Sequence, residues 1–273
     1  MQNKFFTVTA APDIVNGDIS NFMTGGSGSP SAVEIEANDI VFDWAAIDIP
    51  KGVNLLRSVS VWINSEDGAV DADHEAYEFL IAKAFNGKAP ESLGTPGAAI
   101  TAGHLRANLI GAFKLENTDD KTITAAGPLL GGEFYTVTSN ATAVATPNWG
   151  NSLPFVIDCE GSGTNPGYDK IYIACVTKGG RKFGTGVLYN GSDHTAGDHN
   201  INYVTVDGVD ARLVFSVGDK VYPHRSDVAI PGVITKVEQN TLYFSKINST
   251  VDYDNNDGMM CANPIRINLG FER

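Results

Sequence analysis

The chain has 273 residues, of which 42% are hydrophobic, so it is long enough to bury a substantial core. Its formal net charge is −13, and a surface of that sign repels phosphate, which argues against direct binding of nucleic acid. Only 19% of the residues are charged and 29 are glycine, a composition typical of short strands joined by many turns.

The three cysteines, Cys159, Cys175 and Cys261, are odd in number and form no CxxC motif. This pattern argues against a disulfide framework and against a zinc site. Cys175 lies in the apolar run IYIACV, so we expect it to be a small core residue. The N-terminus MQNKFFTVTAAPD lacks the apolar run of a signal peptide, and no stretch is long enough to predict a membrane span. We therefore expect synthesis and folding in a reducing cytoplasm.

Residues 1–30 are predicted to form an extended arm. It begins with the apolar strand FFTVTA and ends in GGSGSP, a tract without side chains to pack. Phe5, Phe6, Phe22 and Met23 are too apolar for a solvated tail. We expect them to dock, either on the main domain of the same chain or on a neighbouring subunit.

A series of strands follows the arm. AVEIEA, DIVFDWAAIDIP and LLRSVSVWIN alternate along the chain with a period of two. EAYEFLIAKAF fits helix and strand templates alike, but the alternation of Tyr77, Phe79 and Ile81 favours a strand. Only AITAGHLRAN, residues 99–108, is a weak helix candidate. Many short strands separated by Pro, Gly, Asn and Asp turns indicate a β-sandwich or jelly roll.

The spacing of predicted strands and turns changes in the C-terminal part of the chain. FSVGDKVYPH followed by IPGVITKVEQNTLYFSK resembles the strand pattern of small SH3-like barrels, with Gln239-Asn240 at a hairpin corner. NPIRINLGFER then alternates as a strand that returns to the main sheet. We predict an all-β chain in three parts: the arm, a sandwich or jelly-roll-like domain of residues 31–202 plus 263–273, and an SH3-like barrel insertion of residues 203–262.

The stretch VDYDNNDGMM, residues 251–260, has the composition of a calcium loop but not its register. Counted from Asp252, an EF-hand loop needs glycine at the sixth position and glutamate at the twelfth. Asp257 and Asn263 stand there instead. We interpret the stretch as a turn before the last strand, with a cation site at 252–257 as the alternative.

Two other polar clusters are also candidates for a cation site. SEDGAVDADHEAYE, residues 65–78, would align Asp71, Asp73 and Glu75 on one face if extended, where they could recruit Ca²⁺ or Mg²⁺. Paired carboxylates held across a cleft could also serve glycoside hydrolysis. SDHTAGDHN, residues 192–200, adds two histidines beside two aspartates. We interpret both clusters as solvated loops and predict no metal ligands and no cofactor.

No catalytic constellation stands out. EGSGT around Ser162 lacks the first glycine of a nucleophile elbow, and neither GxxxxGK[ST] nor GxGxxG occurs before a helix. Without a nucleophile, a base and an orienting group at recognisable spacing, we expect no enzymatic activity. Trp44 and Trp62 fit core positions, whereas Trp149, with Tyr168, is a candidate sugar platform.

Three segments carry a resemblance to a known class of proteins. DIVFDWAAIDIPKG with LLRSVSVWIN, then GDKVYPHRSDVAIPGVITKV, then NPIRINLGFER are together similar to virion structural proteins of tailed bacteriophages, particularly those that infect marine cyanobacteria. The resemblance spans most of residues 33–273.

This resemblance implies a head decoration, or cement, protein that caps capsomers and is commonly trimeric. Such a protein would be made in the host cytoplasm, bind sister copies and the major capsid protein, and reside on the capsid surface. The alternatives are a tail-associated receptor- or glycan-binding module and a glycan-degrading enzyme. From the arm we further predict that residues 1–29 contact another chain.

Overall fold

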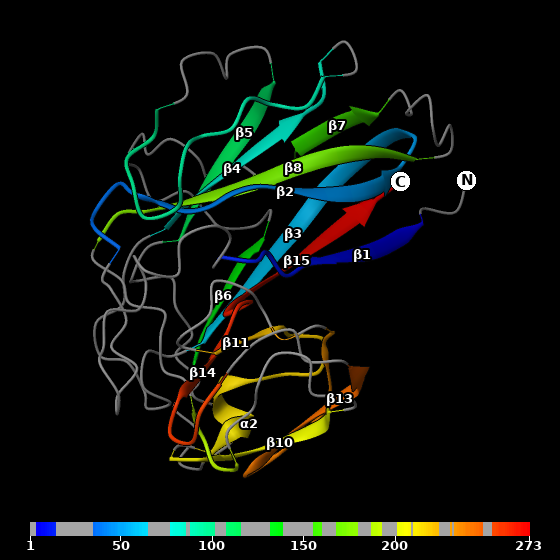
Figure 1. Cartoon of the computed structure of the whole chain (residues 1–273). Helices are drawn as coiled ribbons and strands as arrows, with labels where there is room; N and C mark the ends of the chain where they lie inside the picture. The colour runs from blue at the N-terminus through cyan, green and yellow to red at the C-terminus, as the bar shows by residue number, and fades with distance from the viewer. Residues whose placement is uncertain are drawn as a thin grey trace.

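The computed structural model describes residues 4–14, 35–64, 77–85, 88–101, 108–115, 132–138, 155–159, 168–179, 187–192, 201–208, 210–223, 230, 232–247 and 253–273. These residues are nearly all β, as the composition and the alternation predicted. Their strands form three antiparallel sheets, accompanied by one four-residue helix (Figure 1).

The first sheet contains both the first and the last strand of the chain. Its order is β1 (Phe5–Ala10), β15 (Ile265–Glu272), β3 (Gly52–Asn64) and β6 (Gly132–Thr138), with β7 (Phe155–Cys159) also paired to β3. β6 pairs with residues 58–64 of β3 and β7 with residues 52–56, so the two lie end to end along one edge of β3. The predicted return of the last strand to the main sheet is confirmed, because β15 runs between β1 and β3 (Figure 1).

The second sheet lies over the first. Its order is β2 (Ile40–Pro50), β8 (Tyr168–Thr177), β4 (Tyr77–Lys83) and β5 (Leu109–Leu115). The segment EAYEFLIAKAF, whose pattern fitted both a helix and a strand, therefore contains a strand, β4, as the alternation of its residues favoured. β2 passes into β3 through Lys51 alone, so the chain crosses between the sheets at one tight corner. Gly52 takes a φ of 103° there, and the buried Asn54 amide donates to the Pro50 carbonyl at 2.8 Å.

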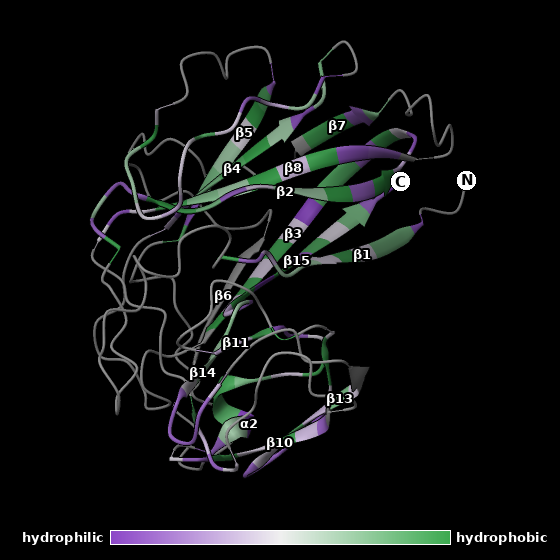
Figure 2. Cartoon of the chain, viewed as in Figure 1, coloured by the Kyte–Doolittle hydropathy of each residue, from purple (hydrophilic) through white to green (hydrophobic). Residues whose placement is uncertain are grey.

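The first two sheets enclose one hydrophobic core. Val59 and Leu269 enter it from the first sheet, and Phe79 and Ile173 enter it from the second. Phe79 lies at a stack of aromatic rings, with its centroid 4.9 Å from that of Phe113. Figure 2 shows the hydrophobic segments that run along β3, β4 and β8. Cys175 is fully buried in this core, as predicted.

The third sheet is built from residues 187–261. Its order is β11 (Val221–Pro223), β14 (Gly258–Cys261), β9 (Val187–Tyr189), β10 (Ile201–Asp207), β13 (Thr241–Ile247) and β12 (Ile234–Glu238). It packs with α2 (Ala211–Val214) around a second core of its own. The predicted hairpin corner at Gln239-Asn240 is confirmed, because Glu238 pairs with Thr241. β9 belongs to this sheet although it precedes residue 203, where the barrel insertion was predicted to begin. The predicted domain boundaries stay predictions.

The structure corrects the strict alternation expected along β3. Leu56 and Val59 are both 0% exposed although they are three positions apart. Opposite them, Phe271 pairs with Leu56 and Gly270 pairs with Ser58. Arg57 is therefore one extra residue in β3, a β-bulge that shifts the alternation by one position.

The predicted strand AVEIEA is also corrected where it is described. Ile35 makes only an isolated bridge, and residues 37–38 form a turn in which Asn38 has a φ of 73°. Asparagine tolerates this left-handed backbone better than most residues, so the chain reverses here before β2 begins.

Candidate functional site

The predicted arm strand pairs with its own chain. β1 runs antiparallel to β15 along its whole length, from Phe5 opposite Glu272 to Ala10 opposite Ile267. The FFTVTA segment therefore satisfies one row of its backbone groups within the subunit. Contact of the arm with another chain stays a prediction.

Phe5 and Phe6 point to opposite faces of the first sheet. Phe6 packs against the core, and its ring stacks on Phe271 with centroids 5.1 Å apart. Phe5 is 71% exposed on the other face. The other two arm residues singled out by the sequence, Phe22 and Met23, lie outside the described residues. Of the described pair, Phe5 is thus the one available to a partner.

β1 is the last strand of its sheet within the described part of the chain. Its register with β15 contains no bulge, and its six residues include no charged residue and no proline. Bulges, charged residues and prolines are the features by which proteins commonly stop an edge strand from pairing with another chain, and β1 has none of them. Among the described strands, β1 therefore presents an edge that can accept a further strand.

A row of apolar side chains, all exposed except the half-buried Leu55, crosses the outer face next to this edge. Directly opposed residues on neighbouring strands share a face. Phe5 opposes Glu272, Glu272 opposes Leu55, and Leu55 opposes Val156. Val53 lies two residues from Leu55 and shares its face. We call Phe5, Val53, Leu55 and Val156 the outer row.

The outer row is apolar with one ion pair inside it. Val156 and Val53 are 67% and 58% exposed. The Nε atom of Arg57 lies 2.6 Å from Oε2 of Glu272, so the charge between Phe5 and Leu55 is compensated. Exposed apolar side chains that cluster over several strands are typical of a surface that binds another protein.

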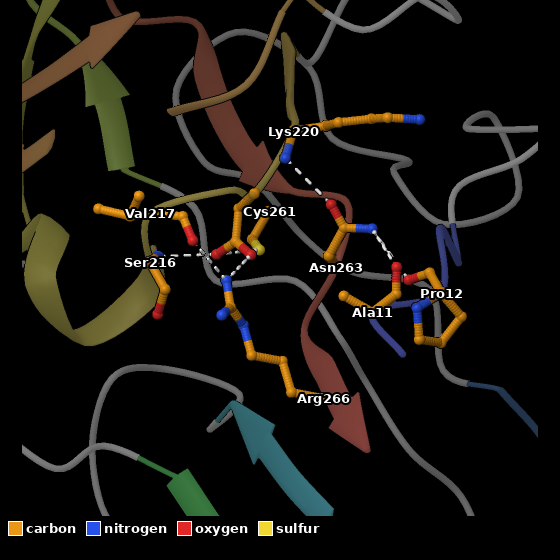
Figure 3. Close-up of polar contacts among 9 residues, drawn as sticks. Ala11, Pro12, Ser216, Val217, Lys220, Cys261, Asn263 and Arg266 are labelled. Atoms are coloured by element: carbon orange, nitrogen blue, oxygen red, sulfur yellow. Dashed lines mark hydrogen bonds and ion pairs between the residues drawn. The ribbon is translucent and has the colours of Figure 1, made fainter. Parts of the chain in front are cut away.

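An ion pair between a buried carboxylate and a half-buried arginine joins the third sheet to the first (Figure 3). The Asp219 carboxylate is 1% exposed and lies just before β11. It accepts a hydrogen bond of 2.6 Å from Arg266 of β15, another of 2.7 Å from the Ser216 N–H, and one from the Cys261 thiol at 3.4 Å. Arg266 also donates to the carbonyl of Val217 at 3.0 Å.

Asn263 extends this junction to the segment after β1. Its side-chain amide donates to the carbonyls of Ala11 and Pro12 at 3.1 and 3.0 Å. Its side-chain oxygen accepts from the backbone N–H of Lys220 at 3.0 Å (Figure 3). One side chain thus links three separate parts of the chain.

Asp13 adds a charged contact to the same place. Its carboxylate lies 3.1 Å from the Lys220 ammonium and accepts from the Tyr222 hydroxyl at 3.4 Å. Burial and the neighbouring Asp13 raise the pKa of Tyr222 to about 12. Tyr222 therefore stays a neutral hydrogen-bond donor across the physiological range.

The charge of Asp219 is poorly solvated at this junction. Burial raises the pKa of the Asp219 carboxyl, and the hydrogen bond and charge of Arg266 oppose that effect. Burial also raises the pKa of the Cys261 thiol beside this carboxylate, so the thiol keeps its proton and the chemistry of the site is that of a structural link. Sequence reasoning missed it, because Arg266 looked like a solvent-facing position of an alternating strand.

The three cysteines are buried and carry no disulfide. Burial raises the pKa of the Cys159 thiol to about 11 and those of Cys175 and Cys261 well above their usual range. A thiol is a weak nucleophile until it loses its proton. These cysteines therefore act as packing residues.

The predicted turn in VDYDNNDGMM is present in its described part. The Asp257 N–H donates to the Asp254 carbonyl at 3.0 Å, and the Asp254 N–H donates to the Asp257 carboxylate at 2.8 Å. Asn256 takes the left-handed conformation with a φ of 69°. Asp252 lies outside the described residues, so cation binding by this stretch stays untested.

The remaining sequence candidates have varied placements. Trp44 is half-buried, packs against a small apolar cluster and donates its indole N–H to the Glu91 carbonyl at 2.8 Å. Trp62 is also half-buried. The other candidates lie outside the described residues or, for Tyr168, have an undescribed side chain. They comprise residues 65–76, Trp149, Ser162 and residues 193–200.

We compared the chain with protein-family models and with curated proteins. Neither comparison finds a match. In the described part of the chain, α2 has four residues and no helix is long and apolar enough to cross a membrane. Within the same residues, no group of three or more His, Cys, Asp or Glu side chains is placed to hold a metal ion.

Proposed function

We propose that this chain is a non-enzymatic virion structural protein of a tailed bacteriophage. In this proposal it is a head decoration protein that binds sister copies, as a homotrimer, and the major capsid protein on the capsid surface. The observation that carries the proposal is the β1 edge with the exposed Phe5 beside it. The resemblance of the sequence to phage virion proteins supplies the biological setting.

The energetics of such a contact suit a repeated lattice. Burial of one phenylalanine side chain contributes roughly 1.5–3 kcal/mol, and an added strand satisfies the free backbone groups of the edge. Each contact is therefore modest for a single copy. Repetition around a trimer and over a shell converts weak contacts into strong attachment by raising the effective concentration.

We also infer a finer description of the fold. The two sheets that share one core would form a jelly-roll-like sandwich, and the third sheet with α2 would form an SH3-like barrel inserted into it. Two observations support this description. The third sheet has its own core, and the chain returns from it to the first sheet through β15.

Substitution of Phe5 tests the contact better than removal of the arm. Deletion of residues 1–29 would also remove β1, and with it a strand of the first sheet. We expect Phe5→Ala to weaken binding to undecorated particles by about tenfold, because it removes an exposed anchor. Its free energy of unfolding should stay within about 0.5 kcal/mol of the wild-type value. Co-sedimentation with particles and urea denaturation measure the two quantities.

Phe6→Ala is the matched control. Phe6 packs on Phe271, so this variant should lose about 2 kcal/mol or more of stability. At temperatures where it remains folded, it should bind particles more tightly than Phe5→Ala does. A Phe5→Ala protein that coats particles with unchanged affinity would contradict the proposal.

A further inference from the structure

The third sheet presents an aromatic and polar face to solvent. Tyr203 of β10 opposes Tyr243 of β13, which opposes Lys236 of β12. The two tyrosine ring centroids lie 6.3 Å apart at an interplanar angle of 45°. One row therefore carries two aromatic rings and a cation across three adjacent strands.

A second row lies directly beside the first. Thr205 of β10 opposes Thr241 of β13, which opposes Glu238 of β12. The residues of the two rows alternate with core residues such as Val204 and Leu242, which are at most 2% exposed. Both rows are thus on the outer side of the sheet. We call the six residues of these rows the tyrosine face.

Part of the tyrosine face is already held in position. The Tyr243 hydroxyl donates to Oε2 of Glu238 at 2.9 Å, and Lys236 pairs with the same carboxylate. The Lys236 ammonium also lies 4.9 Å from the centroid of the Tyr243 ring. Tyr203 remains 60% exposed, so its ring offers an open flat surface next to an organised polar group.

We propose that the tyrosine face binds a neutral saccharide. A pyranose ring has an apolar C–H face, which can stack on the exposed ring of Tyr203, and a rim of hydroxyls. The hydroxyls of Thr205 and Thr241 and the carboxylate of Glu238 offer donors and acceptors for that rim. Tyrosine suits such contacts because it combines a rigid apolar ring with a polar tip.

The composition of the face favours a saccharide over other partners. The Lys236–Glu238 pair leaves no excess positive charge, and the chain carries −13 overall, so a phosphate backbone would be repelled. The two rows contain no aliphatic hydrophobic side chain, which an amphipathic helix would need as a docking surface. An uncharged ligand with many hydroxyls matches what is present.

The tyrosine face and the coat-associated role can be tested separately, because they use different sheets. The probe is an array of neutral oligosaccharides of glucose, galactose, mannose and rhamnose, applied to the full-length protein. We expect at least one member to bind, and titration calorimetry then gives its Kd. Tyr203→Ala should weaken that binding by about tenfold, whereas Tyr203→Phe, which keeps the ring, should stay within about threefold.

Phe5→Ala is the matched control for loss of an exposed aromatic side chain. It should leave saccharide binding unchanged, and Tyr203→Ala should leave particle binding unchanged. Absence of binding to every array member, or equal binding by wild type and Tyr203→Ala, would overturn the proposal. Neither result would affect the test of Phe5.

Discussion

Replacement of Arg266 by methionine is expected to lower the free energy of unfolding by about 3–5 kcal/mol at neutral pH. The substitution leaves the Asp219 carboxylate buried without its cation. The remaining hydrogen bonds, from the Ser216 N–H and the Cys261 thiol, do not neutralise its charge. Methionine preserves much of the length of the arginine side chain, so lost packing contributes little. Urea denaturation measures the loss.

The loss should shrink as the pH falls. Burial raises the pKa of Asp219, and removal of Arg266 takes away the group that opposes this effect. A carboxyl whose folded-state pKa exceeds its unfolded-state pKa favours folding most below the unfolded value. That contribution is lost as the pH rises through the folded value. Arg266→Met should therefore be closer to the wild type at about pH 5 than at neutral pH.

Lys170→Met is the control for this experiment. Lys170 lies 3.8 Å from Asp48, and the two side chains are 54% and 66% exposed. Water solvates both charges, so loss of the lysine should change stability by less than about 0.5 kcal/mol at either pH. If Arg266→Met were equally mild, the junction would not be the link that its geometry indicates.

Alternation in the sequence was informative wherever one face of a strand is buried against another sheet. Tyr77, Phe79 and Ile81 predicted a strand, and they are at most 1% exposed in β4. Ile265 and Ile267 predicted the final strand in the same way. A period of two is a direct consequence of strand geometry, so it survives without knowledge of the partner strand.

Other features depend on contacts that a single sequence does not encode locally. The bulge at Arg57 has no sequence mark, because it arises from the pairing of β3 with β15. Arg266 alternates with buried isoleucines, which predicts exposure, yet Asp219 and the Val217 carbonyl in the segment before β11 bind it and leave it half-buried. Asp219 lies 47 positions earlier in the chain, so no spacing rule connects the two.

The sequence also does not reveal which apolar and aromatic strand residues remain exposed. Val53 and Val156 are apolar and lie in strands, so the sequence favours core positions for them, but both point outward. Tyr203 alternates with Val204 and Val206, so its pattern in the sequence is that of any ordinary strand residue. Alternation identifies two faces of a strand, whereas tertiary packing decides which apolar residues remain at the surface.

Phe79→Ala should cause a loss of similar size, about 3–5 kcal/mol, from the core shared by the first two sheets. Phe79 is 0% exposed, stacks on Phe113 at 4.9 Å and lies 6.3 Å from Phe42 between ring centroids. Alanine removes the whole ring and leaves a cavity that the stiff neighbouring strands cannot close. Phe79→Leu should lose less, since leucine fills part of that space.

Phe5→Ala, which removes the same ring from the surface, should change stability by less than about 0.5 kcal/mol. Thermal and urea unfolding compare the three variants, and a loss below about 1 kcal/mol in Phe79→Ala would mean that the core repacks around the missing ring.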